Sequence, residues 1–167
     1  NFLDAADHTG YKPPENEILP DKQILFDVVQ NIDSKWFMHN AKFDMGMLSR
    51  EGLVPPGLIH CTMATARLVN SEHFHYNLAI CMERMAADLK RAVPQKSDAV
   101  KEYIQTHGLY ENVQIPGKAK VSKNIHMDKV PLSVLLPYGC QDARATRDLG
   151  LYQIQKLRDL TAKSKNI

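Results

Sequence analysis

The chain has no long apolar run. Its longest apolar stretch, near residues 130–136, is framed by Pro131 and Pro137. That stretch falls far short of the roughly 18 apolar residues that a membrane-spanning helix needs. The sequence therefore predicts no membrane partner.

Cysteine and net charge are also scarce. The three cysteines, Cys61, Cys81 and Cys140, have no Cys-x-x-Cys spacing. Their number and spacing argue against a disulfide framework or a zinc site and favour a reducing compartment. A formal net charge of +2 gives only weak support for nucleic-acid binding. Four lysines do gather in one irregular stretch, which is either a solvated basic loop or a phosphate-contacting surface. They are Lys118, Lys120, Lys123 and Lys129.

What the chain does have is the composition of a globular domain with a core, since 44% of its residues are hydrophobic and 24% are charged. The strand and helix patterns alternate in the first half, which indicates an α/β fold. Residues 108–129 show no clear period and are expected to form a loop or insertion. Apolar spacing predicts helices over 21–32, 41–51, 62–69, 76–89, 97–106 and 137–162, and strands over 35–39 and 58–60.

The first segment that could carry chemistry is His-Asn-Ala-Lys-Phe-Asp at 39–44. It follows a predicted strand and opens a predicted helix, in which Phe43 and Met47 are expected to face inward. Ligands of α/β sheets bind outside the carboxyl ends of strands, which makes Asn40 and Asp44 candidate site residues. Each also has a structural interpretation: Asn40 could cap the helix, and Asp44 could be an exposed helix residue.

The second segment is Tyr-Gly-Cys-Gln-Asp at 138–142, on the late helix. Tyr138 and Asp142 are four residues apart and share a helix face. A phenol there could orient a water molecule that a carboxylate-bound metal activates. The structural interpretation is a core tyrosine and a surface aspartate that favours the helix dipole. Two carboxylates from distant segments are what metal-assisted phosphodiester hydrolysis requires.

Together, the two segments resemble the second and third motifs of the DEDD exonuclease superfamily, and the tyrosine resembles that of the DEDDy branch. The flanking sequence extends the resemblance through His60–Met63, Ala66–Leu68 and Asn77–Ala79. Residues 130–138 resemble the lead-in found in the proofreading domain of family A, DNA polymerase I-like polymerases, including phage versions. The resemblance covers most of residues 18–160 and is weakest over 108–129.

The resemblance implies a ribonuclease H-like fold, a mixed sheet flanked by helices, and a single but partial exonuclease domain over 1–167. The implied enzyme is the 3′–5′ proofreading exonuclease of a DNA polymerase, which releases nucleoside 5′-monophosphates. Its implied partners are the 3′ end of single-stranded DNA and the rest of the polymerase chain. The implied location is the cytoplasm of a bacterial cell or a phage-infected host.

The resemblance also implies roles for the catalytic residues, with two Mg²⁺ or Mn²⁺ ions as cofactors. Asp142 would ligate the ion that binds the attacking water, and Asp44 would hold the second ion. Tyr138 would orient the water.

The substrate contacts are implied in the same way. Asn40 would contact the terminal nucleotide, and Phe43 would support the nucleotide pocket. His39 precedes Asn40 and would either bind substrate or serve the structure alone.

One motif of the family is missing. The resemblance implies an Asp-x-Glu motif on the first strand, but Asp4 and Asp7 both lack a glutamate two places on. We therefore expect that the first strands were lost with the N-terminus, and that the isolated chain is inactive while its parent is active. Two alternatives stay open: a stand-alone ribonuclease D-like exoribonuclease, and a non-catalytic scaffold with the exonuclease fold.

A polar turn carries two more candidates. His73 and His75 flank Phe74 and could bind a metal, although an exposed loop is the simpler interpretation. Phe74 or Tyr76 could stack on a nucleic-acid base, and the alternative for both aromatic residues is a place in the core.

Overall fold

The structure is a computed structural model, and its description concerns residues 22–32, 34–92, 99–114 and 121–164. Several residues singled out in the sequence lie outside these ranges: Asp4, Asp7, Lys118 and Lys120. The described residues form a mixed α/β structure, which confirms the predicted class. The ribonuclease H-like arrangement stays a prediction.

The described residues fall into two compact units. The larger unit lies within residues 20–95 and 141–167, and the smaller within 96–140. Helix α7 (Leu132–Ser164) contributes residues to both. A single-domain organisation stays a prediction.

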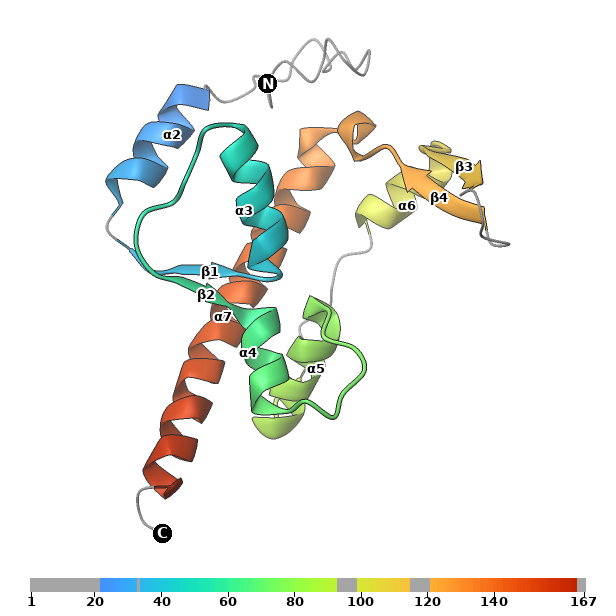
Figure 1. The fold of residues 1–167 in the computed structure, drawn as a ribbon. Helices are drawn as coiled ribbons and strands as arrows, with labels where there is room; N and C mark the ends of the chain where they lie inside the picture. The colour runs from blue at the N-terminus through green and yellow to red at the C-terminus, as the bar shows by residue number, and fades with distance from the viewer. Residues whose placement is uncertain (1–21, 33, 93–98, 115–120, 165–167) are drawn as a thin grey trace. The chain divides into compact units, whose positions relative to one another are not determined.

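The larger unit contains a β–α–β element, in which two short strands pair in parallel. Trp36 lies opposite Ile59, and Met38 opposite Cys61. In Figure 1 the chain leaves the end of β1 through α3 and returns as β2 beside β1. The elements are β1 (Trp36–Met38), α3 (Ala41–Arg50) and β2 (Ile59–Cys61).

The turn before β2 is fixed by backbone and indole hydrogen bonds. The backbone N–H of Trp36 donates to the carbonyl of Leu58 at 2.9 Å, and its indole Nε1 donates to the carbonyl of Pro56 at 2.7 Å. Gly57 has a φ of +88°, and a Cβ there would lie 2.8 Å from the carbonyl oxygen of Ser34. This turn therefore requires glycine.

Three further helices complete the larger unit together with the second part of α7. Asn77 caps α5, since its side chain accepts a hydrogen bond from the backbone N–H of Ile80 at 3.0 Å. The hydrophobic core of this unit joins α5 to α7 through Tyr76, Cys81, Met82 and Leu149. The helices are α2 (Lys22–Asn31), α4 (Thr62–Val69) and α5 (Leu78–Asp88).

Helix α7 approaches the β1–β2 pair closely at two positions. Gly150 is buried, and a Cβ at this position would collide with the ring of Phe37 in β1. Gln153 is 3% exposed; its amide donates to the carbonyl of Thr62 at 2.9 Å, and its oxygen lies 3.2 Å from Nε2 of His60. Glycine at 150 therefore sets the spacing, and the Gln153 amide satisfies buried polar groups.

The smaller unit is built on a core of Val100, Ile104 and Val130. It contains α6 (Ala99–Thr106), an antiparallel hairpin of β3 (Tyr110–Gln114) and β4 (Val121–Ile125), the short 3₁₀ helix η1 (Met127–Lys129), and the first turns of α7. Residues 108–129 were expected to form a loop or insertion; their described part contains β3, β4 and η1 and is therefore not irregular, while its being an insertion stays a prediction. All five residues of β3 are exposed, so they carry no apolar alternation that would mark a strand.

Two other expectations are corrected. Phe43 and Met47 were expected to face inward, but they are 63% and 42% exposed, and α3 buries no residue. The late helix was expected to begin at Pro137, but α7 begins at Leu132 and contains this proline.

The described helices include none with both the length and the apolarity to cross a membrane.

Candidate functional site

Asn40 occupies the sharp reversal between β1 and α3. Its backbone is left-handed, with φ 66° and ψ 51°, a conformation that asparagine adopts more readily than most residues. The residue stands at the N-cap position, but its side chain makes no capping hydrogen bond. The interpretation of Asn40 as a capping side chain is therefore wrong. Its amide is exposed at the carboxyl end of β1, where it can meet a ligand.

His39 is held through both of its ring nitrogens. Nδ1 lies 2.9 Å from Oγ1 of Thr62, and Nε2 lies 2.9 Å from the carbonyl oxygen of Tyr76. Nε2 must carry a hydrogen, because a carbonyl oxygen can only accept. These contacts join the end of β1 to the start of α4 and to the loop before α5. The structural role that the sequence left open for His39 is thus the one its contacts support.

The charges of the two candidate carboxylates act on this imidazole. Burial lowers the pKa of His39, while the Tyr76 carbonyl and then the charges of Asp44 and Asp142 act to raise it. A charge perturbs a pKa in this way only from nearby. Burial also raises the pKa of Asp44, and His39 opposes that rise. The charges of Asp44 and Asp142 therefore both reach His39, although the two residues come from distant segments.

The position of Asp142 follows from the buried face of α7. Thr146, Leu149 and Gln153 are buried, and they recur at helical spacing. Asp142 precedes Thr146 by four residues and so continues the same stripe. The face of α7 that packs against the sheet thus carries Asp142 toward the carboxyl end of β1.

Tyr138 lies one helical turn before Asp142 in α7 and belongs to the smaller unit. There it packs against the cluster formed by Val100, Ile104 and Val130. This contact matches the interpretation of Tyr138 as a core tyrosine. The water-orienting role of its hydroxyl stays a prediction.

A metal ion would meet hard oxygen donors at this site. The carboxylates of Asp44 and Asp142 are ligands of the type that Mg²⁺ and Mn²⁺ prefer. Among the described residues, however, no group of three or more His, Cys, Asp or Glu side chains is arranged to hold an ion. The donor set fits such an ion in kind, and a two-ion site would need further carboxylates.

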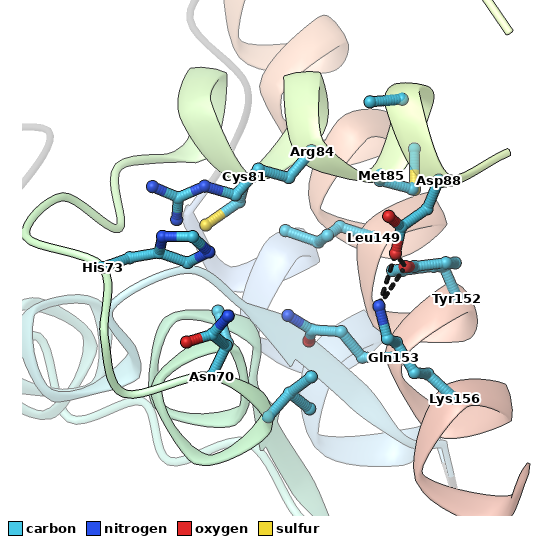
Figure 2. Close-up of a pocket in the computed structure, with 13 residues that line it drawn as sticks. Asn70, His73, Cys81, Arg84, Met85, Asp88, Leu149, Tyr152, Gln153 and Lys156 are labelled. Carbon is cyan, nitrogen blue, oxygen red and sulfur yellow. Dashed lines mark hydrogen bonds and ion pairs between the residues drawn. The ribbon is translucent and has the colours of Figure 1, made fainter. Parts of the chain in front are cut away.

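A separate pocket of about 240 Å³ lies among α4, α5 and α7 (Figure 2). At one end the Asp88 carboxylate accepts hydrogen bonds from Tyr152 and Lys156, and Nζ of Lys156 lies 3.0 Å from the Tyr152 hydroxyl. At the other end, His73 and Arg84 line the wall. The sequence reasoning missed this cluster. Its one local signal was the four-residue spacing of Tyr152 and Lys156.

The cluster shifts the pKa of each member. The hydrogen bond from Lys156 lowers the pKa of Asp88, and the hydrogen bond from the Tyr152 hydroxyl lowers it further. The hydrogen bond to Asp88 raises the pKa of Lys156. Burial, followed by the bond to Asp88, raises the pKa of Tyr152. Asp88 and Lys156 are thus held in their charged forms, so the cluster is an ion pair between α5 and α7.

Three comparisons with known proteins were made for this chain. No family model, curated protein or solved structure matches it.

Proposed function

We propose that this chain carries the second and third motifs of a DEDDy-type 3′–5′ exonuclease, the proofreading domain of a DNA polymerase. One observation carries the proposal: Asp44 and Asp142, from separate segments, both act on the imidazole of His39 at the carboxyl end of β1. Paired carboxylates at such an edge suit metal-assisted phosphodiester hydrolysis. The ribonuclease H-like fold is part of the same proposal.

The residues around the two carboxylates would contact the substrate or position the site. The exposed amide of Asn40 would hydrogen-bond the terminal nucleotide. The ring of Phe43, 63% exposed beside Asp44, would contact the sugar or base. His39 is a positioning residue, because its ring nitrogens are already engaged by Thr62 and Tyr76.

Asp44 and Asp142 would hold divalent ions together with the carboxylates of an Asp-x-Glu motif. Such ions would supply Lewis-acid activation of water and of the scissile phosphate. Tyr138 would orient the attacking water through its hydroxyl. Neutral His39 beside the two carboxylates adds no charge that would compete with a cation.

The proposal implies a longer polymerase chain with an upstream Asp-x-Glu motif, and the test would use that protein. We expect Asp142→Ala to abolish release of 5′-mononucleotides from 3′-labelled single-stranded DNA and to leave primer extension intact. Asp148→Ala is the matched control, because Asp148 also lies on α7 but pairs with Arg147 at 2.8 Å. Exonuclease activity that survives both Asp142→Ala and Asp44→Ala would overturn the proposal.

The same assay separates the alternatives. Faster digestion of an RNA strand than of DNA would favour a ribonuclease D-like enzyme. A wild-type protein that has the Asp-x-Glu motif but releases nothing from either strand would favour a non-catalytic scaffold.

A further inference from the structure

We propose that the loop of residues 70–77, with Arg67 and Arg84, binds the substrate strand away from the scissile bond, with a base stacked on Phe74. The inference rests on the proposed function for its ligand, single-stranded nucleic acid. It adds a strand-binding surface to the site formed by Asn40, Asp44 and Asp142.

The two aromatic side chains of the loop, Phe74 and Tyr76, have opposite degrees of exposure to solvent. Tyr76 is 7% exposed and belongs to the core, whereas Phe74 is 95% exposed. The Tyr76 hydroxyl donates to the carbonyl of Asn70 at 2.6 Å and closes the loop on itself. Phe74 is therefore presented to solvent by a loop that is anchored at Tyr76. An aromatic face held in this way is what a base can stack on.

Two cations flank the anchor. The guanidinium groups of Arg67 and Arg84 lie 5.2 Å and 5.6 Å from the centre of the Tyr76 ring. Arg84 also donates from Nη1 to the carbonyl of His75 at 2.9 Å. Within the described part of the chain, neither guanidinium is paired with a carboxylate. Positive charge is thus fixed beside the buried ring that anchors the loop, and positive charge attracts the phosphates of a strand.

Two histidines and one acidic residue complete the loop. The imidazole of His73 packs edge-on to Tyr76, with ring centres 6.3 Å apart, and lines the pocket together with Arg84 (Figure 2). His75, which follows Phe74 in the sequence, is exposed. Glu72 is the single acidic residue of the loop and only partly offsets the two arginines. The surface is therefore basic on balance, although the chain as a whole has a net charge of only +2.

The loop is tied directly to the candidate site. The Tyr76 carbonyl accepts the hydrogen bond from Nε2 of His39, which precedes Asn40. A strand whose 3′ end reaches Asn40 can thus have an upstream nucleotide on Phe74. The hydrogen bond at Tyr76 thus links the loop to the segment that carries Asn40.

The test measures fluorescence anisotropy of a labelled oligothymidine added to the 167-residue protein in EDTA, so that no hydrolysis occurs. We expect Phe74→Ala to raise the Kd about 5- to 100-fold, the loss of one stacked base, and Phe74→Trp to retain wild-type affinity. Leu58→Ala is the matched control, an exposed apolar side chain outside the loop, 66% exposed, that should leave the Kd unchanged.

The arginines are tested by salt. Arg67→Gln and Arg84→Gln should each lower the slope of log K against log salt by about 0.7, the value for one phosphate contact to a single strand. An unchanged slope in both variants would overturn the phosphate contacts. Circular dichroism of each variant checks that the Tyr76 anchor is still folded.

The outcomes separate the two proposals. Equal binding by wild type and Phe74→Ala, or no binding by wild type at low salt, overturns the proposed strand-binding loop. The proposed exonuclease function is then still decided by the Asp142→Ala assay. Loss of binding in Phe74→Ala, together with a parent polymerase that digests nothing, supports the loop and overturns the exonuclease.

Discussion

At the scale of single residues, His39 is the side chain that links the two candidate motifs. Its ring nitrogens are engaged by Thr62 and Tyr76, and its imidazole feels the charges of Asp44 and Asp142. The sequence could place it only next to Asn40. Its partners lie 23 and 37 residues away, and no local pattern identifies them.

We predict that Asp44→Asn and Asp142→Asn will each lower the pKa of His39 further. Each substitution removes one of the negative charges that stabilise the imidazolium, so burial is opposed by fewer groups. NMR titration of the imidazole protons measures this further lowering of the pKa. Asp148→Asn is the control and should leave the titration unchanged. A pKa that rises in either test variant would contradict the arrangement.

At the scale of elements, the docking of α7 depends on a glycine. We predict that Gly150→Ala will lower the free energy of unfolding by roughly 1–3 kcal/mol, because the added methyl collides with the Phe37 ring. Denaturation by urea, followed by circular dichroism, measures this change.

The same helix supplies the control for Gly150. Nothing lies within 4 Å of a Cβ at Gly139. Gly139→Ala should therefore stabilise the protein by up to about 1 kcal/mol through helix propensity. If Gly150→Ala proved as stabilising as Gly139→Ala, the close contact between α7 and β1 would be refuted.

The ion pair between α5 and α7 gives a dependence on pH. Its partners are partly exposed, with Asp88 49% and Lys156 38% accessible, so we expect Asp88→Asn to cost about 0.5–1 kcal/mol at neutral pH. The folded pKa of Asp88 lies below its ordinary value of 3.8. Its contribution is therefore complete well above pH 3.8 and is lost as the pH falls through 3.8 toward the folded value.

Urea denaturation across this pH range measures the difference between wild type and Asp88→Asn. The two should converge in acid. Asp159→Asn removes a carboxylate on α7 that accepts a neutral hydrogen bond from Gln155, and it should leave the dependence on pH as in wild type. A difference that persists unchanged to low pH would exclude the ion pair as its source.

The apolar periodicity of the sequence predicted helix boundaries better than it predicted which helix faces are buried. The helix over 62–69 was predicted with the boundaries that the structure has, and α3 ends at Arg50, one residue before the predicted end. The prediction of which face of α3 points inward was wrong, because its apolar residues Phe43 and Met47 are exposed. Spacing reveals which residues share a face, but the neighbours of that face are set by tertiary contacts.

At the scale of the whole molecule, the two units differ in how their sheets are supported. The ends of β1 are joined to buried side chains such as Thr62, which is fully buried. The hairpin of β3 and β4 has only exposed residues among those with described side chains. Two-stranded sheets without a buried face are marginal in water.

We therefore predict that amide protons of β3 and β4 exchange with deuterium much faster than those of β1 and β2. The reference segment is residues 146–153 of α7, which includes buried Thr146, Leu149 and Gln153. Hydrogen exchange followed by mass spectrometry reports each segment. Equal protection of the hairpin and of α7 would show that the hairpin has support beyond its own two strands.

At the scale of the whole molecule, part of the candidate site could be predicted from the sequence. Asp44 and Asp142 could be paired in advance, because each is the last residue of a recognisable motif. Gln153 could not be found, because its partners Thr62 and His60 lie about ninety residues away, at separations of 91 and 93. A buried glutamine in a polar stretch of helix has no local signature.

The buried Gln153 also determines where Asp142 points. Its hydrogen bond to Thr62 fixes the rotation of α7, and Asp142 lies about three turns upstream on the same face. One residue inserted between them would turn Asp142 by about 100° around the helix axis. Both side chains would survive such an insertion, yet the carboxylate would leave His39. The position of Asp142 is thus encoded as a distance along the chain as much as by the identity of the residue.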